Sequence, residues 1–225
     1  MDIVYEDNHL IIVNKSAGEL SQSDHTGDSS LVDKVKNYIK TKYKKPGNVY
    51  LGLVNRLDRP TSGLVIFSKT SKSLVRMNKL IKERKIKKIY HAVTEKSPEP
   101  KKGTLINFLK KNQAKNKSFI VNKNELKSKE AILHYTLIKN LNKYFLVEIM
   151  LETGRHHQIR SQLANIGCII KGDVKYGAKR ANKDKSICLH AKSIEFIHPT
   201  TKVKISLDAS PPKSNIWSNQ EKPPC

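Results

Sequence analysis

Nucleotide-cofactor motifs are missing from this chain of 225 residues. Its ten glycines never form Gly-x-Gly-x-x-Gly, the turn that binds a dinucleotide. The stretch 172–179 superficially resembles a phosphate-binding loop, but Ala178 stands where that loop needs a glycine, and no serine or threonine follows Lys179. The sequence therefore favours a chemistry that needs no nucleotide, and we expect no cofactor.

Cysteine and long apolar runs are also scarce. The three cysteines are odd in number and form no Cys-x-x-Cys pair, so neither a disulfide nor a zinc site is indicated. No apolar run approaches the roughly 18 residues of a membrane helix, and the first residues lack the basic and apolar regions of a signal peptide. We therefore expect a cytoplasmic protein with no membrane partner.

Arginine is rare among the basic residues. Only seven of the 43 basic residues are arginine, and Arg56, Arg59, Arg155 and Arg160 fall in two short segments. A guanidinium is a planar cation with several donors, suited to carboxylate or phosphate recognition or to stacking on a base. We predict that the two segments meet in the fold.

Negative charge is scarce too. The formal net charge is +23, from 43 basic against 20 acidic residues, which argues for a polyanionic partner. A lysine-rich background is the simpler interpretation of part of this charge, because lysines are spread along the chain. No amphipathic helix combines an aromatic apolar face with a basic one, so nucleic acid is favoured over a lipid surface.

The first arginine segment, residues 55–63, sets Asp58 between Arg56 and Arg59 just before a bend. The apolar runs 49–54 and 64–67 are typical of strands, and the Pro and Gly between them are typical of a turn. Asp58 is therefore expected at a strand end, where functional sites are often built, and should stay ionised. A turn aspartate in a surface ion pair is the alternative that this spacing leaves open.

The second segment, residues 152–167, is predicted to be a short helix. Ile159, Leu163 and Ile166 recur at helical spacing, and Gly167 would follow the last turn. His156 and Arg160 would then lie one turn apart, near amides that favour an anionic ligand. Adjacent histidines point about 100° apart on a helix, and no further ligand stands at a metal spacing, so we expect no metal.

Strands outnumber helices in the predicted order of elements, which indicates an α+β fold with a largely antiparallel mixed sheet flanked by a few helices. The expected helices begin near Leu31 and Ser71, in addition to the one after Thr153. The expected strands are 9–14, 49–54, 64–67, 86–95, 104–109, 131–139, 144–151, 187–197 and 202–207. We predict a single domain over residues 1–217 and a disordered tail over 218–225.

Several segments in this order resemble the RluA-type pseudouridine synthases. The catalytic motif of that family is matched by 56–58 with 61–63, and the other matching segments are 11–15, 88–93, 153–160 with Gly167 and 172–173, and 189–191 through 198–199. They cover almost the whole chain. The ordered set is far more specific than any one segment alone.

The resemblance implies an isomerase with the pseudouridine synthase catalytic fold, which converts specific uridines of ribosomal or transfer RNA to pseudouridine without a cofactor. Asp58 resembles the catalytic carboxylate, Tyr90 the tyrosine that stacks on the target base, and Arg160 the arginine paired with the aspartate. Arg56 resembles the arginine that helps to displace the target nucleotide. The other expected RNA contacts are Arg59, Arg155 and His156, with Arg59 and Arg155 as phosphate contacts or scaffold, while His190 and His198 are expected to be structural.

The chain departs from the family pattern at two places. Asn55 stands where many members have histidine, so no proton transfer is expected there. Many members also carry a small RNA-binding domain before the core, whereas the match here begins near Met1. Target selection by a monomer is therefore expected to rest on the basic core surface.

Two rival functions stay open at this point. A catalytically silent RNA-binding protein on the same fold would also be basic, although the intact aspartate and arginine segments speak against it. A nucleoside hydrolase or glycosidase would need a second carboxylate, and no motif supplies an obvious one.

Overall fold

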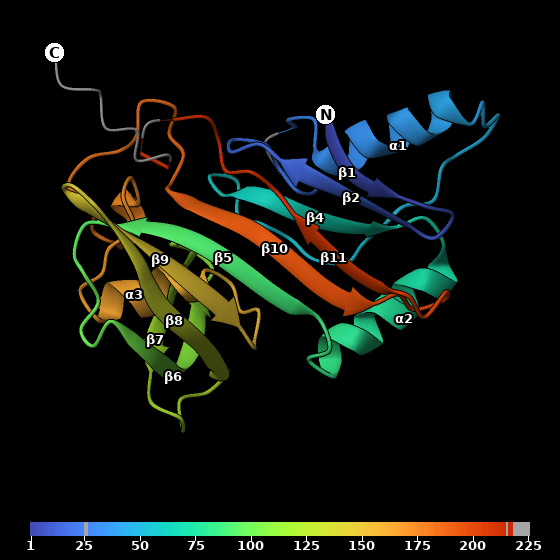
Figure 1. Cartoon of the computed structure of the whole chain (residues 1–225). Coiled ribbons are helices and arrows are strands. Elements are labelled where there is room, and N and C mark those ends of the chain that lie inside the picture. The colour runs from blue at the N-terminus through green and yellow to red at the C-terminus, as the bar shows by residue number, and fades with distance from the viewer. Residues whose placement is uncertain (25–26, 215, 218–225) are drawn as a thin grey trace, which may run out of the picture. The chain divides into compact units, whose positions relative to one another are not determined.

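The computed structural model describes residues 1–24, 27–214 and 216–217 (Figure 1). The chain divides into two compact units. The first unit is Met1–Lys88 with Ala191–Ser210, and the second is Ile89–His190 with the described part of Pro211–Cys225. The predicted tail 218–225 lies outside the described residues. Antiparallel strands dominate both units, so the predicted α+β class is confirmed.

The first unit is a sheet with two helices. Its strands follow the order β1-β2-β4-β10-β11, and a short β3 also pairs with β4. The pairs β1–β2, β2–β4, β3–β4 and β10–β11 are antiparallel. The elements are β1 (Asp2–Glu6), β2 (Leu10–Lys15), α1 (Leu31–Lys42), β3 (Gly52–Leu53), β4 (Ser62–Ser68), α2 (Ser71–Lys82), β10 (Leu189–Ile197) and β11 (Lys204–Asp208).

Burial explains why β2 and β4 form the middle of this sheet. Every residue of β4 is buried, as expected for a strand covered on both faces. Leu10, Leu64 and Met77 belong to one core cluster, which joins β2 and β4 to α2. Burying such side chains contributes about 1.5–3 kcal/mol each. The start of α1 is fixed by a capping box between Ser30 and Asp33.

Gly63 sets how closely β4 and β10 approach each other. Its φ is +116°, a conformation that L side chains rarely adopt. A Cβ on Gly63 would lie 2.4 Å from the carbonyl oxygen of Ala191. The glycine that closes the Asp58 motif is therefore required by backbone packing, whatever the chemistry of the motif.

The second unit has an antiparallel sheet in the order β5-β9-β8-β6-β7. Its strands are β5 (Lys87–Thr94), β6 (Lys102–Asn112), β7 (Lys117–Val121), β8 (Lys129–Leu141) and β9 (Tyr144–Leu151). The helix α3 (Gln158–Asn165) and the single turn η1 (Val174–Tyr176) follow. α3 packs on this sheet, where the buried Gln162 amide donates to the carbonyls of Leu105 and Ala131.

Two strands escaped the sequence analysis. β7 is hidden in a lysine- and asparagine-rich stretch, and β1 lies in the segment inspected only for a signal peptide. The strand predicted over 49–54 is shorter than expected, because only Gly52–Leu53 pairs with β4. Cys168 and Cys188 are buried and free.

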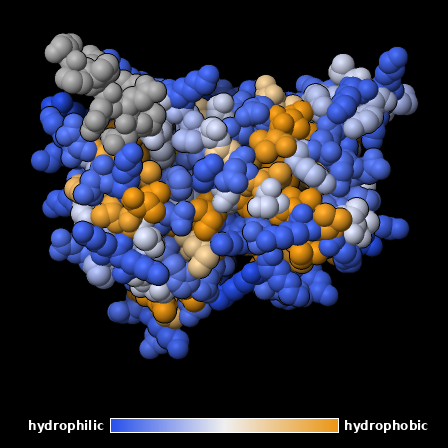
Figure 2. All heavy atoms as spheres, in the orientation of Figure 1, coloured by the Kyte–Doolittle hydropathy of each residue, from blue (hydrophilic) through white to orange (hydrophobic). Residues whose placement is uncertain are grey.

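The visible surface is mostly hydrophilic, as expected for a chain with 28% charged residues (Figure 2). Hydrophilic side chains cover most of the visible surface, and apolar ones gather in small groups (Figure 2). Among the described residues, no helix has both the length and the apolar character that crossing a membrane requires.

Candidate active site

Asp58 lies in the first unit, between β3 and β4, and begins a tight turn. The amide of Thr61 donates to the carbonyl of Asp58 at 3.0 Å, which closes the turn around Pro60. The side chain is partly exposed. The prediction that Asp58 lies at a strand end is therefore wrong, because Asp58 lies in the turn between β3 and β4.

The residues just before Asp58 are clamped by side chains. The Ser21 hydroxyl donates to the carbonyl of Leu57 at 2.8 Å and accepts from its amide at 3.1 Å. The side-chain oxygen of Asn55 accepts from the backbone amide of Ile66 at 2.7 Å, and its side-chain nitrogen donates to the backbone carbonyl of Leu64 at 3.3 Å. Asn55 therefore ties the motif to β4, a role that explains its presence without proton transfer.

A buried lysine holds the other side of the turn. Lys15 is 1% exposed, and its ammonium donates to the carbonyls of Ser16, Glu19 and Arg59 at 2.9, 2.9 and 3.2 Å. Burial lowers the pKa of Lys15 to about 8, against the opposing effect of the Glu19 and Asp58 carboxylates. The lysine thus keeps most of its charge at neutral pH, close enough to Asp58 to interact with it.

The two arginines that flank Asp58 are exposed. The guanidinium of Arg59 donates through Nε to the carbonyl of Gly18 at 3.0 Å and pairs through Nη2 with Asp28 at 2.7 Å. Arg59 therefore fastens the loop after β2 to the turn, as a scaffold residue does. Its contact with RNA, like that of Arg56, remains a prediction.

The predicted helix in the second segment starts later than expected. His157 has φ of +52° and caps α3, so residues 153–157 are not helical. Gln158 holds this loop, because its side-chain oxygen accepts from the Thr153 hydroxyl at 2.8 Å and the Arg155 amide at 2.9 Å. The prediction that His156 and Arg160 lie one turn apart on a helix is therefore wrong.

The rings of His156 and His157 are stacked, with centroids 3.8 Å apart and an angle of 18° between their planes. They do not point about 100° apart as on a helix. His157 is buried and contacts the Tyr176 hydroxyl through Nδ1 at 3.1 Å. The same hydroxyl accepts from the Ser118 amide at 2.9 Å. This network joins α3, η1 and β7.

Arg160 forms a buried ion pair with Asp173. Its Nε and Nη2 donate to Oδ2 and Oδ1 at 2.7 and 2.8 Å, and the two side chains are 5% and 1% exposed. The guanidinium also lies 5.1 Å from the centroid of the Tyr176 ring. In the sequence, Asp173 stands out only as part of a segment that resembles the family, and its pairing with Arg160 was not predicted. The pairing of Arg160 with Asp58 remains a prediction.

Tyr90 lies in β5, opposite Ile149 of β9, and is 8% exposed. Lys88 precedes it by two residues and so shares its face of the strand. Burial lowers the pKa of Lys88. The stacking of Tyr90 on the target base remains a prediction.

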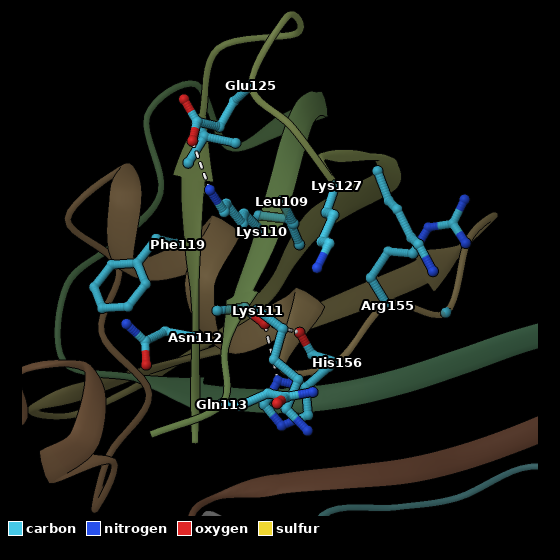
Figure 3. Close-up of a pocket in the computed structure, with 14 residues that line it drawn as sticks. Leu109, Lys110, Lys111, Asn112, Gln113, Phe119, Glu125, Lys127, Arg155 and His156 are labelled. Carbon is cyan, nitrogen blue, oxygen red and sulfur yellow. Dashed lines mark hydrogen bonds and ion pairs between the residues drawn. The ribbon is translucent and has the colours of Figure 1, made fainter. Parts of the chain in front are cut away.

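A basic pocket of about 1080 Å³ lies in the second unit (Figure 3). Arg155 and His156, both predicted to bind RNA, line it together with lysines of β6, of the β7–β8 connection and of the first position of β8. The guanidinium of Arg155 donates through Nε to the carbonyl of Glu130 at 2.8 Å. His156 contacts the Ser118 hydroxyl at 2.9 Å and the Asn116 side-chain oxygen at 3.1 Å.

The first unit thus holds a partly exposed carboxylate in a clamped turn, and the second unit holds a basic pocket that suits a polyanion. The family described as RNA pseudouridylate synthase has a model that matches residues 9–165. The chain belongs to this family, and so to the isomerases that make pseudouridine in RNA.

Two bacterial relatives are each called ribosomal large subunit pseudouridine synthase C. The protein from Buchnera aphidicola subsp. Baizongia pistaciae is 37% identical over 215 residues, which are 92% of this chain and 66% of that protein. The protein from Rickettsia prowazekii is 36% identical and is matched over 93% of this chain and 68% of its own length. The chain thus spans about two thirds of these relatives.

A solved structure shares the fold. It is titled Human RNA Pseudouridylate Synthase Domain Containing 4 and superposes with a TM-score of 0.77, over 94% of this chain and 89% of that one. The two are 21% identical, so this likeness supports the fold alone.

Proposed function

We propose that this protein isomerises uridine to pseudouridine in ribosomal RNA, with Asp58 as the catalytic carboxylate and no cofactor. The observation that carries the proposal is the family match, which includes the clamped Asp58 turn. The names of the relatives from Buchnera and Rickettsia favour RNA of the large ribosomal subunit over transfer RNA.

The reaction leaves the atomic composition of the RNA unchanged. The bond from N1 of uracil to C1′ of the ribose breaks, the base turns over, and C5 bonds to C1′. The proton on C5 is lost, and N1 gains one. Asp58 acts at the sugar or base as nucleophile or general base. Lys15 supports this role, because its charge favours an ionised carboxylate nearby.

The other predicted residues have roles in binding. Tyr90 stacks on the target base, and Arg160 orients the Asp58 carboxylate. Arg56 helps to displace the target nucleotide from its stack. Arg59, Arg155 and His156 contact the RNA backbone. We expect the protein to act in the cytoplasm as a monomer.

The proposal is tested with RNA that carries tritium at C5 of uridine, because isomerisation must release it to water. Purified wild-type protein and Asp58→Asn are incubated with ribosomal RNA lacking modifications and with transfer RNA. Tritium release by the wild type alone, with the RNA mass unchanged, is the expected result. Free uracil would indicate a glycosidase, and no release from either RNA would favour the silent RNA-binding protein.

The cellular target follows from pseudouridine mapping with and without the gene. We expect the loss of at least one pseudouridine in large-subunit ribosomal RNA. A loss confined to transfer RNA would contradict the proposed substrate while leaving the reaction in place.

A further inference from the structure

The pocket of the second unit is lined by three segments. They are the β6–β7 hairpin, the connection from β7 to β8, and the loop before α3. Figure 3 shows Phe119 and Asn112 on one side of it, Arg155 on the other, and Lys127 between them. All of these segments belong to one compact unit, so the pocket is complete within that unit.

The charge of the pocket is strongly one-sided. Its cationic lining residues are Lys110, Lys111, Lys127, Lys129 and Arg155, and its acidic one is Glu125. Glu125 pairs with Lys110 at 2.6 Å. Within the described ranges, Lys111, Lys127 and Lys129 have no acidic partner. Converging ammonium groups repel one another, so an anionic ligand would relieve a cost already present in the folded protein.

The shape and the remaining lining favour a polymer over a small anion. The volume of about 1080 Å³ exceeds the ~300–1,000 Å³ of ordinary small-molecule sites. Phe119 is 37% exposed at the rim, and the Lys117 ammonium lies 5.4 Å from the centroid of its ring. An exposed aromatic ring beside cations is the combination that binds single-stranded nucleic acid, because every base has a face that can stack.

We infer that this pocket, termed the hairpin groove, binds a single-stranded segment of the substrate RNA outside the target nucleotide. Phosphates contact Lys111, Lys127, Lys129 and Arg155, and a base stacks on Phe119. The bases of a duplex face inward and offer Phe119 no free face, so we expect a duplex to bind more weakly. The inference rests on the proposed function for the identity of the RNA, but not for the existence of the site.

The proposed role of the hairpin groove is tested by measuring RNA binding, an assay that does not require catalytic turnover. The variant K111Q/K127Q/K129Q removes three exposed charges without changing chain length. The matched control K45Q/K72Q/K82Q removes three exposed lysines of the first unit. Binding of a fluorescent single-stranded uridine 12-mer and of an RNA duplex of equal length is measured from low to physiological salt, with each full-length protein.

The expected result separates the two triple variants. Loss of three phosphate contacts lowers the log-log salt slope for the single strand by roughly 2. We expect at least a tenfold loss of affinity for the single strand in the groove variant and less than a threefold loss in the control. Equal losses in the two variants would overturn the inference, as would equal competition by the duplex or by polyglutamate.

Phe119 gives an independent readout. Phe119→Leu keeps the apolar bulk and removes the stacking ring, so we expect a loss of affinity that does not change with salt. Ultraviolet crosslinking of the uridine 12-mer should label a peptide containing residues 117–121. A crosslink elsewhere, with normal affinity of Phe119→Leu, would show that no base stacks there. Weak tritium release with normal groove binding would instead contradict only the proposed function.

Discussion

The guanidinium of Arg160 donates two parallel hydrogen bonds to the carboxylate of Asp173 inside the second unit. Nε lies 2.7 Å from Oδ2, and Nη2 lies 2.8 Å from Oδ1. Both side chains are almost fully buried, at 5% and 1% exposure. Removing one partner of such a pair leaves a buried charge, which typically costs about 3–5 kcal/mol. The pair therefore fixes the orientation of Arg160 before any substrate arrives.

Asp173→Asn is expected to lower the free energy of unfolding by about 3 kcal/mol. The amide has nearly the same shape as the carboxylate but cannot neutralise the guanidinium. Urea unfolding of the wild type and Asp173→Asn measures the difference. Asp28→Asn is the matched control, because the Asp28–Arg59 pair is about half exposed and should be worth less than about 1 kcal/mol. Equal effects of the two variants would mean that the buried pair contributes no more than a surface one.

Arg160→Lys keeps the charge and removes the planar fork. An ammonium cannot make two parallel bonds to Asp173, so its position should change. A small misplacement of a catalytic group can cost on the order of a hundredfold in rate. We expect a fall in kcat of that size and a milder effect of Arg59→Lys. Normal turnover of Arg160→Lys with an inactive Arg59→Lys would show that the roles of the two arginines are exchanged.

Asp58→Asn is expected to abolish turnover and to leave RNA affinity and stability near those of the wild type. The substitution removes one ionised group from a partly exposed side chain and changes a net charge of +23 by one unit. Tritium release, RNA binding and urea unfolding are measured on the same preparation. Activity near the wild-type level would assign the chemistry to another residue.

The parts of the fold that the sequence predicts are those with strong periodicity. The strand predicted over 144–151 matches β9 residue for residue, and apolar runs locate β2, β4 and β8. β7 escaped because its five residues alternate only weakly within a lysine-rich stretch. Short strands of this kind are fixed by their partners, here β6, rather than by their own pattern.

The site was predicted less completely, for a different reason. Pro60 and Gly63 indicated a turn near Asp58 but not that Asp58 itself begins it, and the roles of Lys15 and Asp173 depend on contacts between distant segments. The late start of α3 comes from the left-handed backbone of His157, a conformation that few non-glycine residues adopt and that helical spacing does not indicate. Side chains that bond distant backbone groups leave little signal in sequence spacing.

Lys15→Met is expected to destabilise the protein and slow turnover, although Lys15 need not touch the substrate. Methionine fills a similar volume but leaves the carbonyls of Ser16 and Glu19 without the Lys15 donor, whereas the Arg59 carbonyl keeps its bond from the Gly18 amide at 2.7 Å. These carbonyls are only partly buried, so each lost bond should cost about 0.5–1.5 kcal/mol. Unfolding and kcat are compared with those of Lys34→Met, an exposed lysine. A variant as stable and active as Lys34→Met would show that the clamp is dispensable.

Gly63→Ala and Gly18→Ala separate steric clash from backbone strain. Both glycines have positive φ, but a Cβ on Gly18 meets nothing within 4 Å, whereas one on Gly63 meets the backbone of Ala191. Gly18→Ala should cost about 1–2 kcal/mol. Gly63→Ala should exceed about 4 kcal/mol, since backbone atoms must move. Thermal unfolding of the two variants measures both losses of stability. Similar losses in Gly63→Ala and Gly18→Ala would mean that β10 can move away from Gly63 without penalty.

His198 makes stability depend on pH. Its buried ring accepts through Nδ1 from the amides of Thr200 and Thr201 at 3.2 and 2.9 Å, which requires a neutral ring. Burial lowers the pKa of His198 below its usual 6.5; Asp7 acts in the opposite direction, while His9 and Lys202 add to the lowering. Below about pH 6.5 the unfolded chain binds a proton that the folded protein still excludes, so stability falls with decreasing pH.

The free energy of unfolding should therefore decrease from pH 7 to pH 5 in the wild type. His198→Asn keeps an acceptor for the two amides but cannot titrate, so its curve should be flatter over this window. Burial alone would raise the pKa of the Asp7 carboxyl, but hydrogen bonds from the backbone of Leu10 and His9 hold that pKa below its usual 3.8. Its own loss of stability comes only at lower pH, outside this window. Parallel curves of the two proteins between pH 7 and pH 5 would show that another group carries the dependence.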